Sequence, residues 1–123
     1  MSHVSHISSA ASQTARREIA MLPRLLKSGE QVVDICYGTA TGGATAVVVV
    51  TDRRVMYMRR RRFWGAHVES VPLARVHSAE EWIGVRHATV RIDAGGRQFE
   101  LADVDRGLAQ MFCARVRATL NAA

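Results

Sequence analysis

The chain has 123 residues, of which 48% are hydrophobic, and a formal net charge of +6. This length suits one hydrophobic core, because domains usually contain about 100 to 150 residues. The longest apolar run, residues 44–50, is too short to cross a bilayer as a helix, and the polar start of the chain does not resemble a signal peptide. We therefore expect one cytoplasmic domain.

The basic balance comes almost entirely from arginine, which supplies sixteen of the seventeen basic residues. A general drift of composition toward arginine would produce the same balance without an anionic partner. Only a cluster of cations would therefore indicate such a partner.

Residues 1–29 are expected to form a tail and a helical arm. Over residues 12–22, Ala15, Ile19 and Leu22 fall on one helical stripe, and Glu18 lies largely off it. Pro23 then interrupts the pattern. A kinked helix and two short helices, the second ending at Ser28 and Gly29, both satisfy this pattern.

From residue 31 the pattern alternates between apolar and polar positions, as in strands that have one buried face. Tight turns are expected at Asp52-Arg53 and at Gly95-Gly96. The pattern predicts seven strands, at 31–37, 44–51, 54–59, 67–71, 75–82, 86–93 and 98–101.

Two of these strands indicate which side chains are buried. Val47 to Val50 is apolar on both faces, which predicts a strand inside the sheet with both faces covered. In the first strand we expect one face, Val33, Ile35 and Tyr37, to point inward and the other, Asp34 and Cys36, to point away. Trp82 is also interpreted as a core residue.

The last element is expected to be a helix that Asp103 caps and that ends near Leu120. Its apolar side chains, which include Val104, Phe112 and Val116, fall on one stripe. This helix should therefore cover the sheet as part of the core.

Seven antiparallel strands closed by one amphipathic helix resemble the pleckstrin-homology (PH) superfold. Three segments are similar to motifs of its bacterial, YokE-like or GRAM-like branch: LKSGEQV at 26–32, TDRRV at 51–55 and SVPLARV at 70–76. The resemblance implies an α+β, mainly β, fold, namely a PH-like barrel of about seven antiparallel strands capped by the C-terminal helix, with an extra N-terminal helix. The PH-like domain would occupy residues 30–121, and the family implies that it is noncatalytic.

No arrangement of a nucleophile, a base and an orienting residue indicates catalysis. His67, His77 and His87 are assigned to different strands, and neighbouring Glu80 and Glu81 face opposite sides of theirs. We therefore expect no enzyme activity, no cofactor and no small-molecule substrate.

No metal site is expected either. His3 and His6 lack a third ligand. Cys36 and Cys113 have no metal-ligand spacing, and two free buried thiols are favoured over a disulfide.

One cluster could bind a ligand: Arg53, Arg54, Arg59, Arg60, Arg61, Arg62 and Trp64. Cations beside an exposed aromatic suit anionic lipid headgroups, nucleic acid or an acidic protein, although a solvated strand end has the same composition. The loop at 38–43 carries no cation, so phosphoinositide binding is not implied by the resemblance.

These observations predict a noncatalytic interaction module that binds a protein or self-associates through an open strand edge. The alternative is weak contact with an anionic surface, either membrane lipid or nucleic acid, through the segment Arg59 to Trp64.

Overall fold

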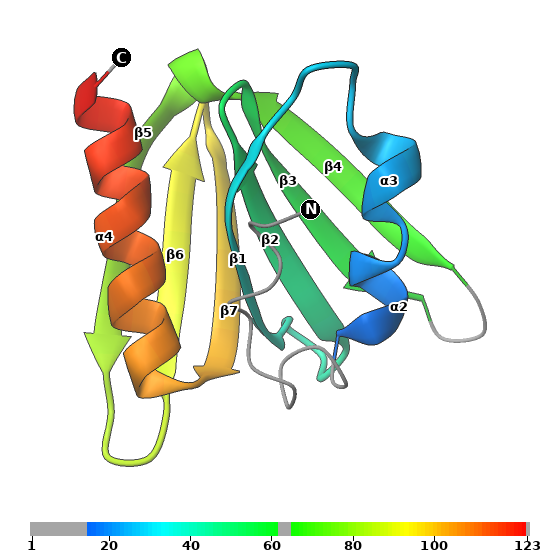
Figure 1. The fold of residues 1–123 in the computed structure, drawn as a ribbon. Coiled ribbons are helices and arrows are strands. Elements are labelled where there is room, and N and C mark those ends of the chain that lie inside the picture. The colour runs from blue at the N-terminus through cyan, green and yellow to red at the C-terminus, as the bar shows by residue number, and fades with distance from the viewer. Residues whose placement is uncertain (1–14, 62–64, 123) are drawn as a thin grey trace.

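The computed structural model describes residues 15–61 and 65–122, which form one antiparallel sheet with helices against both of its faces (Figure 1). Within these residues the sheet has seven strands in the order β4-β3-β2-β1-β7-β6-β5. The strands are β1 (Val32–Thr39), β2 (Thr45–Thr51), β3 (Arg54–Arg60), β4 (Ala66–Pro72), β5 (Val76–Ile83), β6 (Ala88–Ala94) and β7 (Arg97–Val104). The helices are α2 (Arg16–Ile19), α3 (Leu22–Leu25) and α4 (Arg106–Ala122), and the short 3-10 helix η2 (Leu73–Arg75) precedes β5. The predicted fold class is confirmed.

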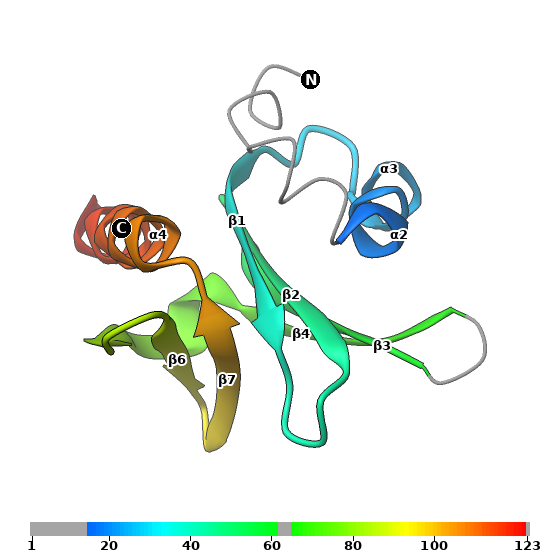
Figure 2. The same cartoon turned by 90° about the horizontal axis from the view of Figure 1, so that it is seen from below.

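The sheet bends where β1 meets β7, and this divides it into a β1–β4 half and a β5–β7 half (Figure 2). The two strands pair at Thr39 and Ala102. Gly38 allows this close approach, because a Cβ atom at residue 38 would lie 2.5 Å from the Ala102 carbonyl oxygen.

The central hairpin of β2 and β3 confirms the prediction for the valine run. Val48 and Val50 lie in the larger hydrophobic core, whereas Val47 and Val49 lie in a second core on the opposite face of the sheet. All four side chains are inaccessible to solvent. A strand that is apolar on both faces is therefore covered on both.

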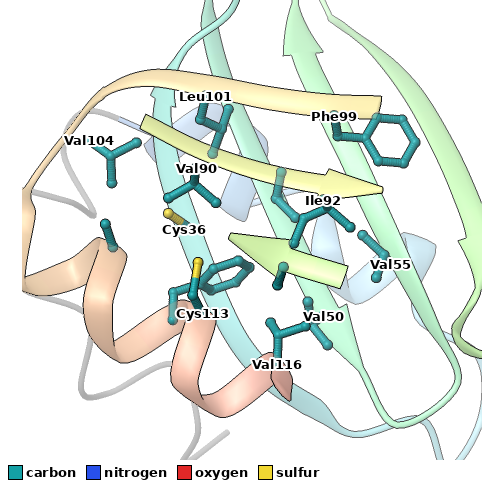
Figure 3. Close-up of a cluster of buried hydrophobic side chains, with 14 of the residues drawn as sticks. Cys36, Val50, Val55, Val90, Ile92, Phe99, Leu101, Val104, Cys113 and Val116 are labelled. Carbon is teal, nitrogen blue, oxygen red and sulfur yellow. The ribbon is translucent and has the colours of Figure 1, made fainter. Parts of the chain in front are cut away.

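The larger core lies between the two halves of the sheet and beneath α4 (Figure 3). The helix contributes Phe112, Cys113 and Val116 to it. Cys36 of β1 belongs to the same cluster, and both cysteines are free and buried, as predicted. Burial, and then the neighbouring Cys113, raises the pKa of Cys36, so this thiol stays protonated.

The predicted facing of β1 is wrong in part. Cys36 lies in the larger core, and Asp34 forms an ion pair with Arg115 of α4 at 3.6 Å. Ile35 and Tyr37 lie on the opposite face, beneath the N-terminal arm. Because both faces of β1 are covered, alternation alone could not identify which face belongs to the main core.

The N-terminal arm consists of two one-turn helices, α2 and α3, which pack on the outer face of β1–β3 (Figure 2). Ala15 and Leu22 are buried there, as the stripe predicted, and Ile19 packs against the same cluster. The position of Glu18 off this apolar stripe suggested an exposed side chain. Its carboxylate is instead fully buried and pairs with Arg60.

The start of the last helix differs from the prediction. Asp103 belongs to β7 with a left-handed backbone, φ 55°, and the buried Val104 ends that strand. The cap is Asp105, whose Oδ2 accepts the Leu108 N–H at 2.9 Å. Two aspartates separated by one residue offered two possible caps, and the strand pairing of Val104 with Ala88 excludes the first.

Trp82 is not a core residue: it is 45% exposed near the end of β5, which is an edge strand. The Arg91 guanidinium lies 4.7 Å from the centre of its ring.

No helix in the described part of the chain has both the length and the hydropathy of a membrane span.

Candidate functional site

The structure separates the predicted arginine cluster into two groups at opposite ends of β3. Arg53 and Arg54 lie at its start, whereas Arg59, Arg60 and Arg61 lie at its end. Six residues of extended strand place Arg54 and Arg60 about 20 Å apart. The two groups therefore do not form one continuous surface. Arg62 and Trp64 lie outside the described residues.

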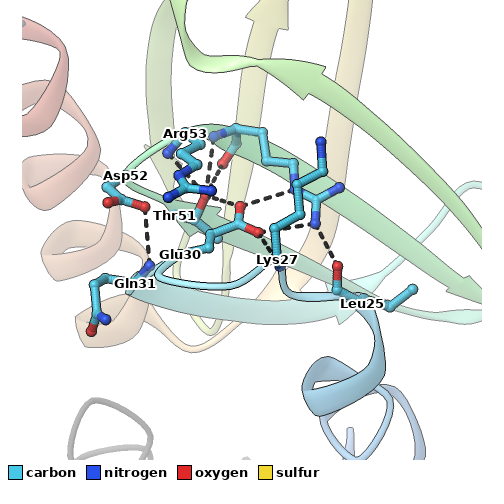
Figure 4. Close-up of polar contacts among 8 residues, drawn as sticks. Leu25, Lys27, Glu30, Gln31, Thr51, Asp52 and Arg53 are labelled. Carbon is cyan, nitrogen blue, oxygen red and sulfur yellow. Dashed lines mark hydrogen bonds and ion pairs between the residues drawn. The ribbon is translucent and has the colours of Figure 1, made fainter.

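Arg54 holds the N-terminal arm to the hairpin. Figure 4 labels its partners Leu25 and Glu30. The Arg54 guanidinium donates to both carboxylate oxygens of Glu30, at 2.9 and 3.0 Å, and to the Leu25 carbonyl at 2.6 Å. The Thr51 hydroxyl donates to the same carboxylate at 2.6 Å. Burial by itself would raise the pKa of Glu30, but the hydrogen bonds from Arg54, the Lys27 N–H and Thr51 outweigh burial and lower it to about 2.

Arg60 makes the corresponding contact at the other end of the strand. It donates to both oxygens of Glu18, at 2.8 and 3.1 Å, and this carboxylate is inaccessible to solvent. The hydrogen bond to Glu18 raises the pKa of Arg60. Two of the predicted ligand-binding arginines thus hold the arm against the sheet.

The other described members of the predicted cluster point into solvent. Arg53, Arg59 and Arg61 are exposed and form no ion pair within the described part of the chain. Arg61 borders an open hollow of about 500 Å³ beside the glycine-rich loop at 42–45. Arg59 borders a second hollow, which the sequence did not reveal.

This second hollow is a cleft of about 280 Å³ between the two halves of the sheet. Its lining includes the stacked rings of Tyr57 on β3 and Phe99 on β7, whose centres lie 5.2 Å apart. The Arg97 guanidinium lies over the Phe99 ring at 5.4 Å. Tyr57 is half-buried, whereas Phe99 is buried, so the accessible aromatic surface beside these cations comes from Tyr57.

Polar groups on β4 connect the two sides of the cleft. Glu69 Oε1 lies 2.9 Å from His67 Nε2, and its other oxygen accepts a hydrogen bond from Arg97. The hydrogen bond with His67 and the contact with Arg97 lower the pKa of Glu69, despite its partial burial. Arg59 stands beside His67 across the strands, and Glu100 completes the charged lining. Two arginines and two glutamates therefore share this cleft.

Sequence reasoning missed this cleft except for Arg59. The spacing of Tyr57 and Arg59 indicated that both share one face of a strand. Nothing in the sequence indicated that the start of β7 would lie opposite them. That neighbourhood depends on the bend between β1 and β7.

The other side chains considered for catalysis or metal binding lie on different elements of the fold. His67, His77 and His87 lie on β4, on β5 and in the connection before β6. Glu80 is exposed, whereas Glu81 faces α4 and pairs with Arg117 at 3.1 Å. Within the described residues no group of three metal-ligating side chains comes together.

The architecture is that of a PH-like domain. One similar solved structure is the hSac2 domain from human phosphoinositide phosphatase Sac2, with 8% identity and a TM-score of 0.62, covering 94% of this chain and 85% of that chain. Another is a pleckstrin homology domain from Shewanella amazonensis SB2B, with 19% identity and a TM-score of 0.54, covering 82% of this chain and 96% of that chain. At these identities the likeness shows the fold alone.

The family follows from the sequence. The family model described as bacterial PH domain matches residues 26–118, and the chain belongs to this family. A comparison with curated protein sequences finds no match.

Proposed function

We propose that this bacterial PH domain is a noncatalytic module that binds a protein segment in the cleft between the two halves of its sheet. The observation that carries the proposal is the lining of the cleft, where the half-buried Tyr57, which stacks on the buried Phe99, lies beside charges of both signs. Peptides present apolar side chains together with backbone donors and acceptors, and such a lining can satisfy both.

The balance of charge favours a protein over a polyanion. Arg59 and Arg97 are offset by Glu69 and Glu100, and Arg97 is already engaged by Glu69. A phosphate-rich ligand would have to approach two carboxylates, which repel it. A peptide with one acidic group and one apolar side chain would meet both requirements.

The test uses a displayed library of random peptides selected against the full chain. Peptides that bind in the cleft should lose at least about tenfold in affinity on Arg97→Gln, since a charge-assisted contact contributes about 1.5 to 3 kcal/mol. Arg75→Gln is the matched control, because Arg75 is an exposed arginine outside the cleft lining. If selected peptides bind wild type and Arg97→Gln equally, the cleft is not the binding site.

Self-association through an open strand edge is the other form of protein binding that we propose. β4 and β5 end the sheet order of the described strands, and unpaired edges readily accept another strand. β5 is the less favourable edge for pairing with a second chain, because it has a bulge between Val76 and Ser78 and carries the adjacent Glu80 and Glu81. Light scattering after size exclusion, over a range of protein concentrations, would detect this association, and a constant monomer mass would contradict it.

A second candidate function is contact with an anionic surface through the segment from Arg59 to Trp64. The specific observation is the exposure of Arg59 and Arg61 without a carboxylate partner among the described residues. At about 1 kcal/mol per cation such contact is weak. Binding to anionic vesicles or DNA should then fall steeply with salt and on Arg61→Gln. Binding that is insensitive to both would exclude this candidate.

We also propose that the domain is cytoplasmic and that it belongs to the YokE-like or GRAM-like branch of its family. The support for the branch is the three motifs at 26–32, 51–55 and 70–76.

A further inference from the structure

Exposed apolar side chains gather at the connection between β5 and β6. The described residues include four exposed large hydrophobic side chains, and three of them are Trp82, Ile83 and Val85, with exposures of 45, 38 and 92%. The fourth, Met111, lies on α4. The connection projects beyond the start of α4 (Figure 1). The apolar group thus forms a protruding tip rather than a groove.

Arginines surround this tip. Arg86 is exposed within the same connection. Arg91 lies over the Trp82 ring, and Arg106 Nη1 donates to the Val85 carbonyl at 3.3 Å. The nearby acidic residues are Glu80 and Glu81 on β5, Asp93 beside Arg91, and Asp103 and Asp105 at the junction of β7 and α4; Glu81 pairs with Arg117. The local charges nearly cancel, so apolar contact would dominate binding at this tip.

We infer that the tip formed by residues 82–86 contacts the surface of a lipid bilayer, with Ile83 and Val85 entering the interface and Trp82 at the level of the headgroups. Tryptophan favours this level because its ring is apolar and its N–H is polar. Arginine side chains can reach lipid phosphates while their stems stay in the apolar layer. β5 ends at Ile83, and the Gly84 N–H donates to the His87 carbonyl at 2.9 Å to close the turn that follows, so Val85 lies at the outer end of this hairpin.

The shape of the tip favours a bilayer over a protein partner. A narrow convex tip buries little area against a folded protein, whereas a bilayer surrounds it. This inference goes beyond the proposed function, because neither the cleft nor the segment from Arg59 to Trp64 takes part.

The test measures sedimentation of the full chain with vesicles of equimolar phosphatidylcholine and phosphatidylglycerol. Val85→Asp should lower the partition coefficient at least about tenfold, because full burial of a valine supplies about that factor. Met111→Glu is the matched control, since it changes the exposed apolar residue of α4, and it should leave partitioning unchanged. Val85 is almost fully exposed, so circular dichroism should show both variants folded.

Tryptophan fluorescence locates the contact, because the chain has two tryptophans. In Trp64→Phe, where Trp82 is the sole reporter, vesicles should shift the emission to the blue, whereas in Trp82→Phe they should not. Partitioning should change little between about 0.1 M and about 1 M salt, although the Debye length falls from about 10 to about 3 Å.

The inference would be overturned by no sedimentation with vesicles, by equal partitioning of Val85→Asp and wild type, or by a blue shift confined to Trp82→Phe. The last result would instead assign membrane contact to the segment from Arg59 to Trp64. Loss of vesicle binding in Arg97→Gln would likewise assign it to the cleft. Binding of the tip to a protein, without vesicle binding, would also refute it.

Discussion

Replacing Glu30 with Gln should destabilise the domain substantially, because this buried carboxylate joins the arm to the central hairpin. Its side chain is inaccessible to solvent and accepts hydrogen bonds from Arg54 and Thr51. The pKa of Glu30 falls from the ordinary 4.5 to about 2. Each pKa unit corresponds to about 1.4 kcal/mol, so ionised Glu30 contributes about 3 kcal/mol to the free energy of unfolding.

The pH dependence has a definite sign. Because the pKa is lower in the folded state, the contribution is complete above about pH 4.5 and is lost as the pH falls toward about 2. Glu30→Gln should therefore be about 3 kcal/mol less stable than wild type at neutral pH, and the difference should shrink in acid. Urea unfolding followed by circular dichroism over a pH series measures both quantities.

Two controls separate charge from packing. Glu100→Gln alters an exposed glutamate that forms no ion pair among the described residues, and it should change stability by less than about 0.5 kcal/mol. Replacing the pair together, Glu30→Met with Arg54→Leu, should cost less than Glu30→Gln alone, since no buried charge is left without its partner. If Glu30→Gln were as stable as wild type, or equally destabilised at every pH, this account of the ion pair would be refuted.

Four further substitutions test the packing of the core and the roles of individual arginines. Arg60→Gln should lower the free energy of unfolding by about 3 to 5 kcal/mol, because it leaves the buried Glu18 without its partner, whereas the exposed Arg61→Gln should change it by less than about 0.5 kcal/mol. Equal urea midpoints for the two variants would contradict this difference. Phe112→Ala should cost about 3 to 5 kcal/mol, since the side chain is fully buried under α4; an unchanged melting temperature would show that this helix is not part of the core. Gly38→Ala should also lower the melting temperature, because the added methyl group would meet a β7 carbonyl at 2.5 Å, and a wild-type melting curve would argue against the tight β1–β7 contact.

Most of the secondary structure could be predicted from local patterns. The valine run indicated a doubly covered strand, and β2 and β3 pair as expected. Period, turn residues and the apolar stripe of the last helix are local properties, so the chain reveals them without its fold. The PH-like architecture followed from the order of these elements.

Side-chain roles at long range could not be predicted in this way. Arg54 and Arg60 belong to a cationic cluster in the sequence, but each pairs with a buried glutamate 24 or 42 residues away. Tryptophan is typical of a protein core, yet the sheet order leaves β5 at an edge, and the Trp82 indole is exposed. Whether a charge binds a partner or holds the fold together depends on which residues become its neighbours.

The sequence alone determined approximately where the strands and the last helix lie, but not their ends, and which positions are apolar, because these depend on residues close together in the chain. Only the tertiary structure decided that the arm covers the outer face of β1–β3, that Tyr57 meets Phe99 across a cleft, and that the tip at residues 82–86 stays exposed. These features arise where the bend at β1 and β7 brings distant segments together or leaves them apart, and local periodicity carries no information about that geometry.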